Sequence, residues 1–255
     1  MSDTRIPTRL ERPPLQTLAS SGPRRLAVVV LLLAAAVCAR LGIWQLARLH
    51  QRRAANQEVL KARAEPPISL DQPGPRDSAA VAQRWVTATG RYDRRQELVL
   101  RGQAYQGTPG VHVVTPLRLP GSDTAVLVIR GFVPAPDAVR ANLDSLDEPG
   151  ERRVVGLAQP IGSGRGKPLM LTGRSTWARL DYAALSRSLP YPILPLAILQ
   201  TPDSTLPHHP LRLTPPDVDD GPHLSYAVQW FLFSAMAIAF AVVVVARTGS
   251  TRRAP

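Results

Sequence analysis

Two long apolar runs, one near each end of the chain, dominate the pattern of hydrophobic and polar positions. In the second run, from Ala227 to Ala246, every residue is apolar except Gln229 and Ser234. About twenty helical residues, at ~1.5 Å rise each, cover the ~30 Å hydrocarbon core of a bilayer. The pattern therefore predicts a transmembrane helix at residues 226–246.

The first apolar run allows two interpretations. Residues 26–39 are apolar without a break, as in the core of a signal peptide, and Ala34–Ala36 resembles a cleavage site. The apolar pattern nevertheless continues beyond Arg40, whose aliphatic stem can carry its charge to the membrane surface. We therefore predict an uncleaved transmembrane helix at residues 26–46. The alternative is an enzyme or binding protein released by signal cleavage, and N-terminal sequencing of the mature chain would decide between them.

Short strand-like segments lie between the two runs. They are rich in β-branched and aromatic residues, and turns containing glycine or proline separate them at intervals of ~8–12 residues. We expect strands at 85–92, 97–101, 111–119, 125–132, 152–158 and 193–200. A short helix is expected at 181–189, capped by Asp181 and ended by Pro190. These elements predict a mainly β domain, an antiparallel sheet or barrel-like structure, at residues 83–205.

The expected fold class is therefore a membrane protein in which two transmembrane α-helices flank a mainly β extracytoplasmic domain. Little apolar surface and several prolines characterise the remaining segments. These are a disordered cytoplasmic tail at 1–25, a juxtamembrane segment and linker at 47–82, a proline-rich lead-in at 206–225 and a cytoplasmic tail at 247–255.

Charges beside the second helix predict its orientation. Acidic residues precede the helix and basic residues follow it: Asp217, Asp219 and Asp220 on one side, Arg247, Arg252 and Arg253 on the other. Positive residues favour the cytoplasmic side, so the C-terminus is expected in the cytoplasm. Two spans then place the N-terminus there too and the central domain outside.

Composition narrows the function classes. The formal net charge is +12, but the basic residues are spread along the chain and form no tract interleaved with aromatic residues, so nucleic acid is not an expected partner. Cys38, the single cysteine, lies in the first apolar run and allows no intramolecular disulfide.

Catalytic motifs are missing from the sequence. The glycine-rich stretch 164–167 lacks the glycine and hydroxyl residue of a phosphate-binding loop, so a turn is expected. The chain has no Gly-x-Ser-x-Gly elbow, and its central domain has no cysteine nucleophile. Histidines and aspartates also gather before the second helix, but their spacing matches no zinc motif and a solvated linker is expected. They are His208, His209, Asp217, Asp219, Asp220 and His223. We do not expect an enzyme.

Aromatic and polar side chains mark the outer ends of both predicted helices. His223, Tyr226 and Trp230 have the i, i+3, i+7 spacing of one helical face, and Trp44 and Arg48 are separated by one turn. Two helices so arranged could enclose a flat amphipathic ligand, with its acidic groups toward arginine. The alternative is an interfacial belt of the kind that anchors many membrane helices.

Four motifs occur in a fixed order between and within the two helices. They are LGIWQLAR at 41–48, GTPGVHVVTPL at 107–117, VIRGFVP at 128–134 and HLSYAVQWF at 223–231. Together they resemble the surfeit-locus-one family of cytochrome c oxidase assembly proteins.

The resemblance implies a chaperone of respiratory chain biogenesis in the bacterial cytoplasmic (inner) membrane, without catalytic turnover. Bacterial members are associated with the delivery of haem a to oxidase subunit I. The implied partners are subunit I, other oxidase assembly or haem a synthesis proteins, and the lipid bilayer.

The resemblance also assigns roles to the residues at the helix ends. His223 aligns with the family's histidine and is the candidate axial ligand of haem a iron, because imidazole offers a nitrogen lone pair. Tyr226, Trp230 and Trp44 would contact the macrocycle, and Arg48 would meet a propionate. The alternative is a membrane scaffold that binds oxidase subunits and carries no cofactor.

Overall fold

The computed structural model describes residues 22–72, 77–164, 166–171 and 173–250. Most of both predicted tails, part of the predicted linker at 73–76, and Arg165 of the predicted turn at 164–167 lie outside the described residues. The chain divides into two compact units, Met1–Arg53 with Asp220–Pro255, and Ala54–Asp219. We call them the helix unit and the barrel unit.

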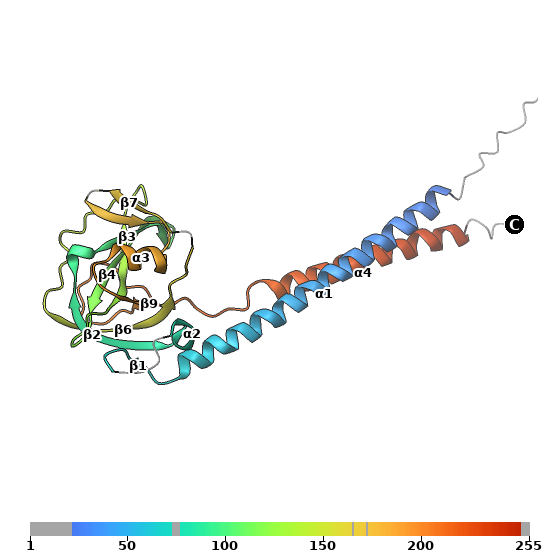
Figure 1. Ribbon diagram of the computed structural model, residues 1–255. Coiled ribbons are helices and arrows are strands. Elements are labelled where there is room, and N and C mark those ends of the chain that lie inside the picture. The colour runs from blue at the N-terminus through green and yellow to red at the C-terminus, as the bar shows by residue number, and fades with distance from the viewer. Residues whose placement is uncertain (1–21, 73–76, 165, 172, 251–255) are drawn as a thin grey trace, which may run out of the picture. The chain divides into compact units, whose positions relative to one another are not determined.

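Two antiparallel helices form the described part of the helix unit. They are α1 (Gly22–Ala64), of which residues up to Arg53 belong to this unit, and α4 (His223–Ser250). Both are long and apolar enough to cross a membrane, and they lie side by side in Figure 1. The Ser234 hydroxyl donates to the carbonyl oxygen of Ala35 at 2.9 Å, which joins the helices within their apolar parts.

Helix α1 extends well beyond the apolar run that predicted it. Residues 47–64 contain neither proline nor glycine and are rich in alanine and arginine, which both favour helix. A hydropathy pattern identifies only the apolar part of a helix, which can lie in the membrane. The polar continuation therefore looked like a juxtamembrane segment.

Besides the end of α1 after Arg53, the described barrel unit contains nine strands and three short helices. The strands are β1 (Ile68–Ser69), β2 (Trp85–Tyr92), β3 (Leu98–Tyr105), β4 (Thr108–Arg118), β5 (Ala125–Pro134), β6 (Glu151–Pro160), β7 (Pro168–Leu171), β8 (Arg174–Trp177) and β9 (Ile193–Gln200). The helices are α2 (Ser78–Val81), the 3-10 turn η1 (Arg94–Gln96) and α3 (Tyr182–Ser188). Asp181 caps α3 as expected, accepting a hydrogen bond from the backbone N–H of Ala184.

The strands close into a barrel. Their order is β1-β2-β6-β9-β5-β4-β3-β8-β7, and an additional β2–β4 pairing joins two strands that are distant in that order. This pairing closes β2, β6, β9, β5 and β4 on themselves, while β3, β8 and β7 continue outward from β4. The predicted fold class, two long apolar helices flanking a β-rich and barrel-like domain of a membrane protein, is confirmed.

The sheet is mixed, not purely antiparallel. Strands β5 and β9 pair in parallel, as do β3 and β8. A parallel pair needs a long crossover, and residues 135–192 supply one between β5 and β9. Turn signals in the sequence indicate hairpins but not such long-range pairings.

Glycine at position 131 lets a distant segment reach the barrel. Gly131 has φ +154°, and a Cβ there would lie 2.4 Å from the carbonyl oxygen of Leu211. Its neighbour Phe132 exchanges backbone hydrogen bonds with Leu211 in both directions, at 2.8 and 2.9 Å. The lead-in to α4 is thereby fixed against β5 within the barrel unit.

Candidate functional site

Mostly small side chains at seven-residue intervals, with one leucine, form the interface between α1 and α4. Seven residues are nearly two helical turns, so each set lies along one face, and small residues let two helix backbones approach closely. The buried positions are Ala35, Gly42 and Leu49 on α1, and Ala227, Ser234 and Ala241 on α4. We call this interface the seam.

At the N-terminal end of α4, the predicted ligand His223 meets α1. Its Nδ1 lies 2.9 Å from Oε1 of Gln45, and the contact is half-buried. An amide oxygen only accepts, so this contact makes Nδ1 the protonated nitrogen and leaves the lone pair on Nε2. His223 lies in the first turn of α4, because the helix begins there and the Tyr226 N–H donates to the carbonyl oxygen of Pro222.

The other two predicted residues of α4 differ in their surroundings. Trp230 is half-buried beside the seam, and its ring meets that of Phe233 edge-on with centroids 5.8 Å apart. Tyr226 is 47% exposed at the margin of the same face. His223 and Trp230 are separated by seven residues and so share one stripe of α4.

Helix geometry does not bring the predicted residues of α1 to His223. Trp44 is two residues after the seam position Gly42, hence about 200° around the helix, and is 48% exposed. Arg48 is exposed and donates to Oε1 of Gln51 at 3.0 Å, within its own helix. The side chain of α1 that meets His223 is instead Gln45.

An ion pair lies at the same end of the helix unit. Arg53 Nε is 2.8 Å from Oδ2 of Asp220, and both side chains are substantially exposed. Exposed pairs contribute ~1 kcal/mol or less. The pair therefore joins α1 to the residue segment before α4 but adds little to the free energy of unfolding.

These contacts fit a single imidazole ligand for haem. A hydrogen bond at one ring nitrogen fixes the tautomer and orients the other nitrogen, which is the usual second-shell arrangement for a metal-bound histidine. The half-buried indole of Trp230 adds an apolar surface about two helical turns further along the same stripe of α4. Within the described residues, no three His, Cys, Asp or Glu side chains gather to hold a metal ion.

The barrel unit contains a buried network of charged side chains. Arg130 is fully buried; its Nη1 donates to Glu97 Oε2 at 3.1 Å and its Nη2 to Glu148 Oε1 at 2.6 Å. Arg212 also donates to Glu148. Burial alone would raise the pKa of Glu148, but hydrogen bonds and charges of both arginines outweigh it and hold the pKa below its usual value.

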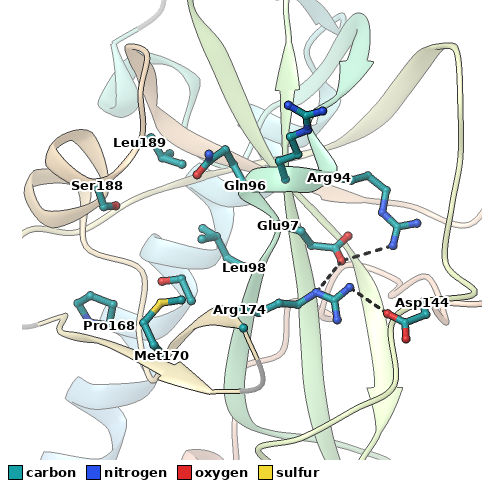
Figure 2. Close-up of a pocket in the computed structure, with 13 residues that line it drawn as sticks. Arg94, Gln96, Glu97, Leu98, Asp144, Pro168, Met170, Arg174, Ser188 and Leu189 are labelled. Carbon is teal, nitrogen blue, oxygen red and sulfur yellow. Dashed lines mark hydrogen bonds and ion pairs between the residues drawn. The ribbon is translucent and has the colours of Figure 1, made fainter.

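Next to this network is a hollow of about 580 Å³, shown in Figure 2. Arg94 of η1, Arg174 of β8 and the buried Glu97 line one side, and Pro168 and Met170 of β7 line another. The sequence did not reveal this site, because its residues are far apart along the chain and the pairing of β3 with β8 brings them together.

Known proteins resemble this chain over most of its length. Residues 32–235 match the model of the SURF1 family. A SURF1-like protein of Monosiga brevicollis is 28% identical over 233 residues, which is 84% of this chain and 87% of that protein. SURF1-like proteins of Mycobacterium bovis and Mycobacterium tuberculosis are each 28% identical over 234 residues, 88% of this chain and 84% of theirs.

Proposed function

The chain belongs to the SURF1 family, and from this premise we propose that it holds haem a at the joined ends of α1 and α4 and assists the insertion of haem a into oxidase subunit I. The family is associated with oxidase assembly. The proposal that the chain binds haem a rests on the 2.9 Å contact between His223 Nδ1 and Gln45 Oε1.

Each residue at this end has a defined task in the proposal. Gln45 holds the Nδ1 proton of His223 and so directs Nε2 outward as a ligand. Trp230 offers an apolar face, and exposed Tyr226 borders the same face. Haem a would supply an iron that an imidazole nitrogen can ligate. Trp44 and Arg48 stay a prediction for this site.

The cellular setting is part of the proposal. In the proposal, α1 and α4 each cross the membrane once, and two crossings would put both termini on one side. Acidic residues precede α4 and Arg247 lies at its end, so the positive-inside rule favours the cytoplasm for both termini. The barrel unit would then lie in the periplasm. The proposed partners are subunit I and the proteins that synthesise or insert haem a in the bacterial inner membrane.

Visible absorption of the purified chain tests the haem site. The full-length protein is purified in detergent from cells that make haem a, together with His223→Ala and the control His50→Ala. His50 is an exposed imidazole on α1 near the same end of the helix unit. We expect bound haem in the unaltered and His50→Ala proteins, and at least a ten-fold reduction in His223→Ala.

Gln45→Ala tests whether Gln45 orients the His223 imidazole, as distinct from a general effect on folding. This variant keeps the ligand but loses the tautomer-fixing bond, so haem content falls and the absorption maximum shifts, while His50→Ala resembles the unaltered protein. Equal haem content in the His223→Ala and His50→Ala proteins would reject His223 as the ligand. Complete absence of haem from the unaltered protein would favour the cofactor-free scaffold.

A further inference from the structure

We propose that the hollow beside β7 binds an extended acidic segment of a partner protein, which adds to the edge of the sheet. The inference goes beyond the proposed function and does not depend on haem. It rests on the position of β7, the charges around it and one buried carboxylate oxygen.

Strand β7 is the outermost strand of the sheet, at the end of the order β3-β8-β7. An edge strand can pair with a strand from another chain through main-chain hydrogen bonds. β7 begins with Pro168, which has no N–H, but beyond it the apolar side chains of Leu169 and Met170 are 48% and 70% exposed on this edge. The strand therefore has the features of an edge kept open for a partner.

Two adjoining hollows beside β7 are strongly basic. The first contains Arg94, Arg95 and Arg174; the second, about 470 Å³ in volume, contains Lys167 and Arg187, and the hollows share Pro168. Guanidinium groups bind carboxylates through paired hydrogen bonds, so an acidic ligand is the complementary one.

Exposed Asp147, 3.2 Å from Nη1 of Arg94, compensates part of this charge, and the carboxylates of the hollows themselves are bound elsewhere or held weakly. Glu97 is buried and bound to Arg130, and Asp181 is buried and accepts backbone N–H groups of Gly164, Gly166 and Ala184. Asp144, beside Arg174 at 3.3 Å, is 82% exposed and so weakly held. A carboxylate from a partner can replace it.

Glu97 provides an independent sign of a ligand. Its Oε1 is buried without a hydrogen bond, 3.7 Å from Arg174 Nε and 3.9 Å from Arg94 Nη2. Figure 2 shows this oxygen between the two guanidinium groups at the wall of the hollow. Both distances exceed a hydrogen bond, so the acceptor still needs a donor. A side-chain donor of the segment that reaches into the hollow would supply it, and the segment's carboxylates bind the arginines.

The alternation of β7 indicates the sequence pattern of the segment. Pro168 and Met170 face the first hollow, and Leu169 lies on the opposite face. A segment paired with β7 would present every second residue to the arginines and the others beside Leu169. An alternation of acidic and β-branched residues fits both faces.

Peptide binding tests the proposal. The full-length chain in zwitterionic lipid nanodiscs is titrated with a fluorescent peptide of repeated Glu-Val units, and Arg174→Gln and Arg95→Gln are compared with Arg140→Gln. Arg140 is exposed and pairs with Asp137 outside both hollows, so the three variants lose the same charge. We expect at least ten-fold weaker binding for Arg174→Gln, several-fold for Arg95→Gln and no change for Arg140→Gln.

Additional binding measurements distinguish the proposed acidic segment from other ligands. Binding of a Lys-Val peptide with equal affinity, or equal losses in Arg174→Gln and Arg140→Gln, would overturn the proposal. Displacement of the peptide by millimolar inorganic phosphate would show a free-anion site and overturn the edge pairing. Haem content plays no part in these measurements, so their failure would leave the proposed haem site untouched.

Discussion

Arg130 shows how a single residue can decide the stability of the barrel unit. Its guanidinium is fully buried and serves Glu97, Glu148 and the carbonyl oxygen of Leu146 at once. It also lies over the ring of Tyr92, with Cζ 5.0 Å from the centroid. Arg130 therefore links two buried carboxylates, and of these Glu148 is also bound by Arg212.

Replacement of Arg130 by methionine should be severely destabilising. The side chain keeps similar volume, but Glu97 retains only the more distant Arg174 and Arg94, at 3.7 and 3.9 Å, and breaking a buried ion pair costs about 3–5 kcal/mol. Urea denaturation of the full chain in detergent measures the loss. Arg140→Met, which removes an exposed pair with Asp137, should cost less than ~1 kcal/mol. Equal costs for the two variants would contradict the network's role.

His112 makes the stability of the barrel unit depend on pH. Burial lowers the pKa of His112 from 6.5 to about 4. Between pH 4 and pH 6.5, His112 binds a proton in the unfolded chain but not in the folded chain. The free energy of unfolding is therefore highest above pH 6.5 and falls as the pH drops toward 4. The difference corresponds to about 3 kcal/mol.

Unfolding midpoints measured at pH 7 and pH 4.5 test this assignment. His112→Phe keeps an aromatic ring next to Phe132, whose ring meets that of His112 edge-on, and should remove most of the pH dependence. His208→Ala, at an exposed histidine, should retain it. An unchanged pH dependence in His112→Phe would assign the effect to other groups.

At the scale of elements, the seam between α1 and α4 depends on small residues. Lipid supplies little hydrophobic drive for two membrane helices to associate, so close packing has to supply it. A Cβ at Gly42 would lie 2.8 Å from ring atoms of Phe231. An alanine can be accommodated by rotation of that ring, but a longer side chain cannot.

Gly42→Leu should therefore separate the helices, whereas Ala36→Leu, at an exposed position of α1, should not. Oxidative cross-linking between Ala35→Cys and Ser234→Cys, in a Cys38→Ser background, reports the pairing, since Ser234 binds the backbone of Ala35. We expect at least a five-fold loss of cross-linked product for Gly42→Leu. Equal cross-linking in both leucine variants would reject the seam.

At the scale of the whole molecule, the sequence predicted the elements better than their partners. Long apolar runs predicted α1 and α4, and alternation with turn residues predicted β2, β5 and β9, because these signals are local. The parallel pairings, and strands β7 and β8 at 168–177, were missed because short strands and long crossovers leave no local pattern.

For the candidate site too, the sequence predicted which residues share a helix face but not which residues meet across the two helices. Helical spacing placed His223 and Trp230 on one stripe correctly, since the period of a helix is fixed. It did not identify Gln45 as the partner of His223, which depends on the register of two helices. The seven-residue recurrence of Ala35, Gly42 and Leu49 was a signal that could have given that register.

Oxidase assembly in living cells tests the central claim most directly. A strain lacking this chain is complemented with the unaltered gene, His223→Ala or His50→Ala, and the haem a absorbance and activity of cytochrome c oxidase in its membranes are compared with b-type and c-type cytochromes. We predict that deletion and His223→Ala lower oxidase haem a and activity several-fold, while the other cytochromes and the His50→Ala strain are unchanged. Full oxidase content and activity in the deletion strain would contradict the account.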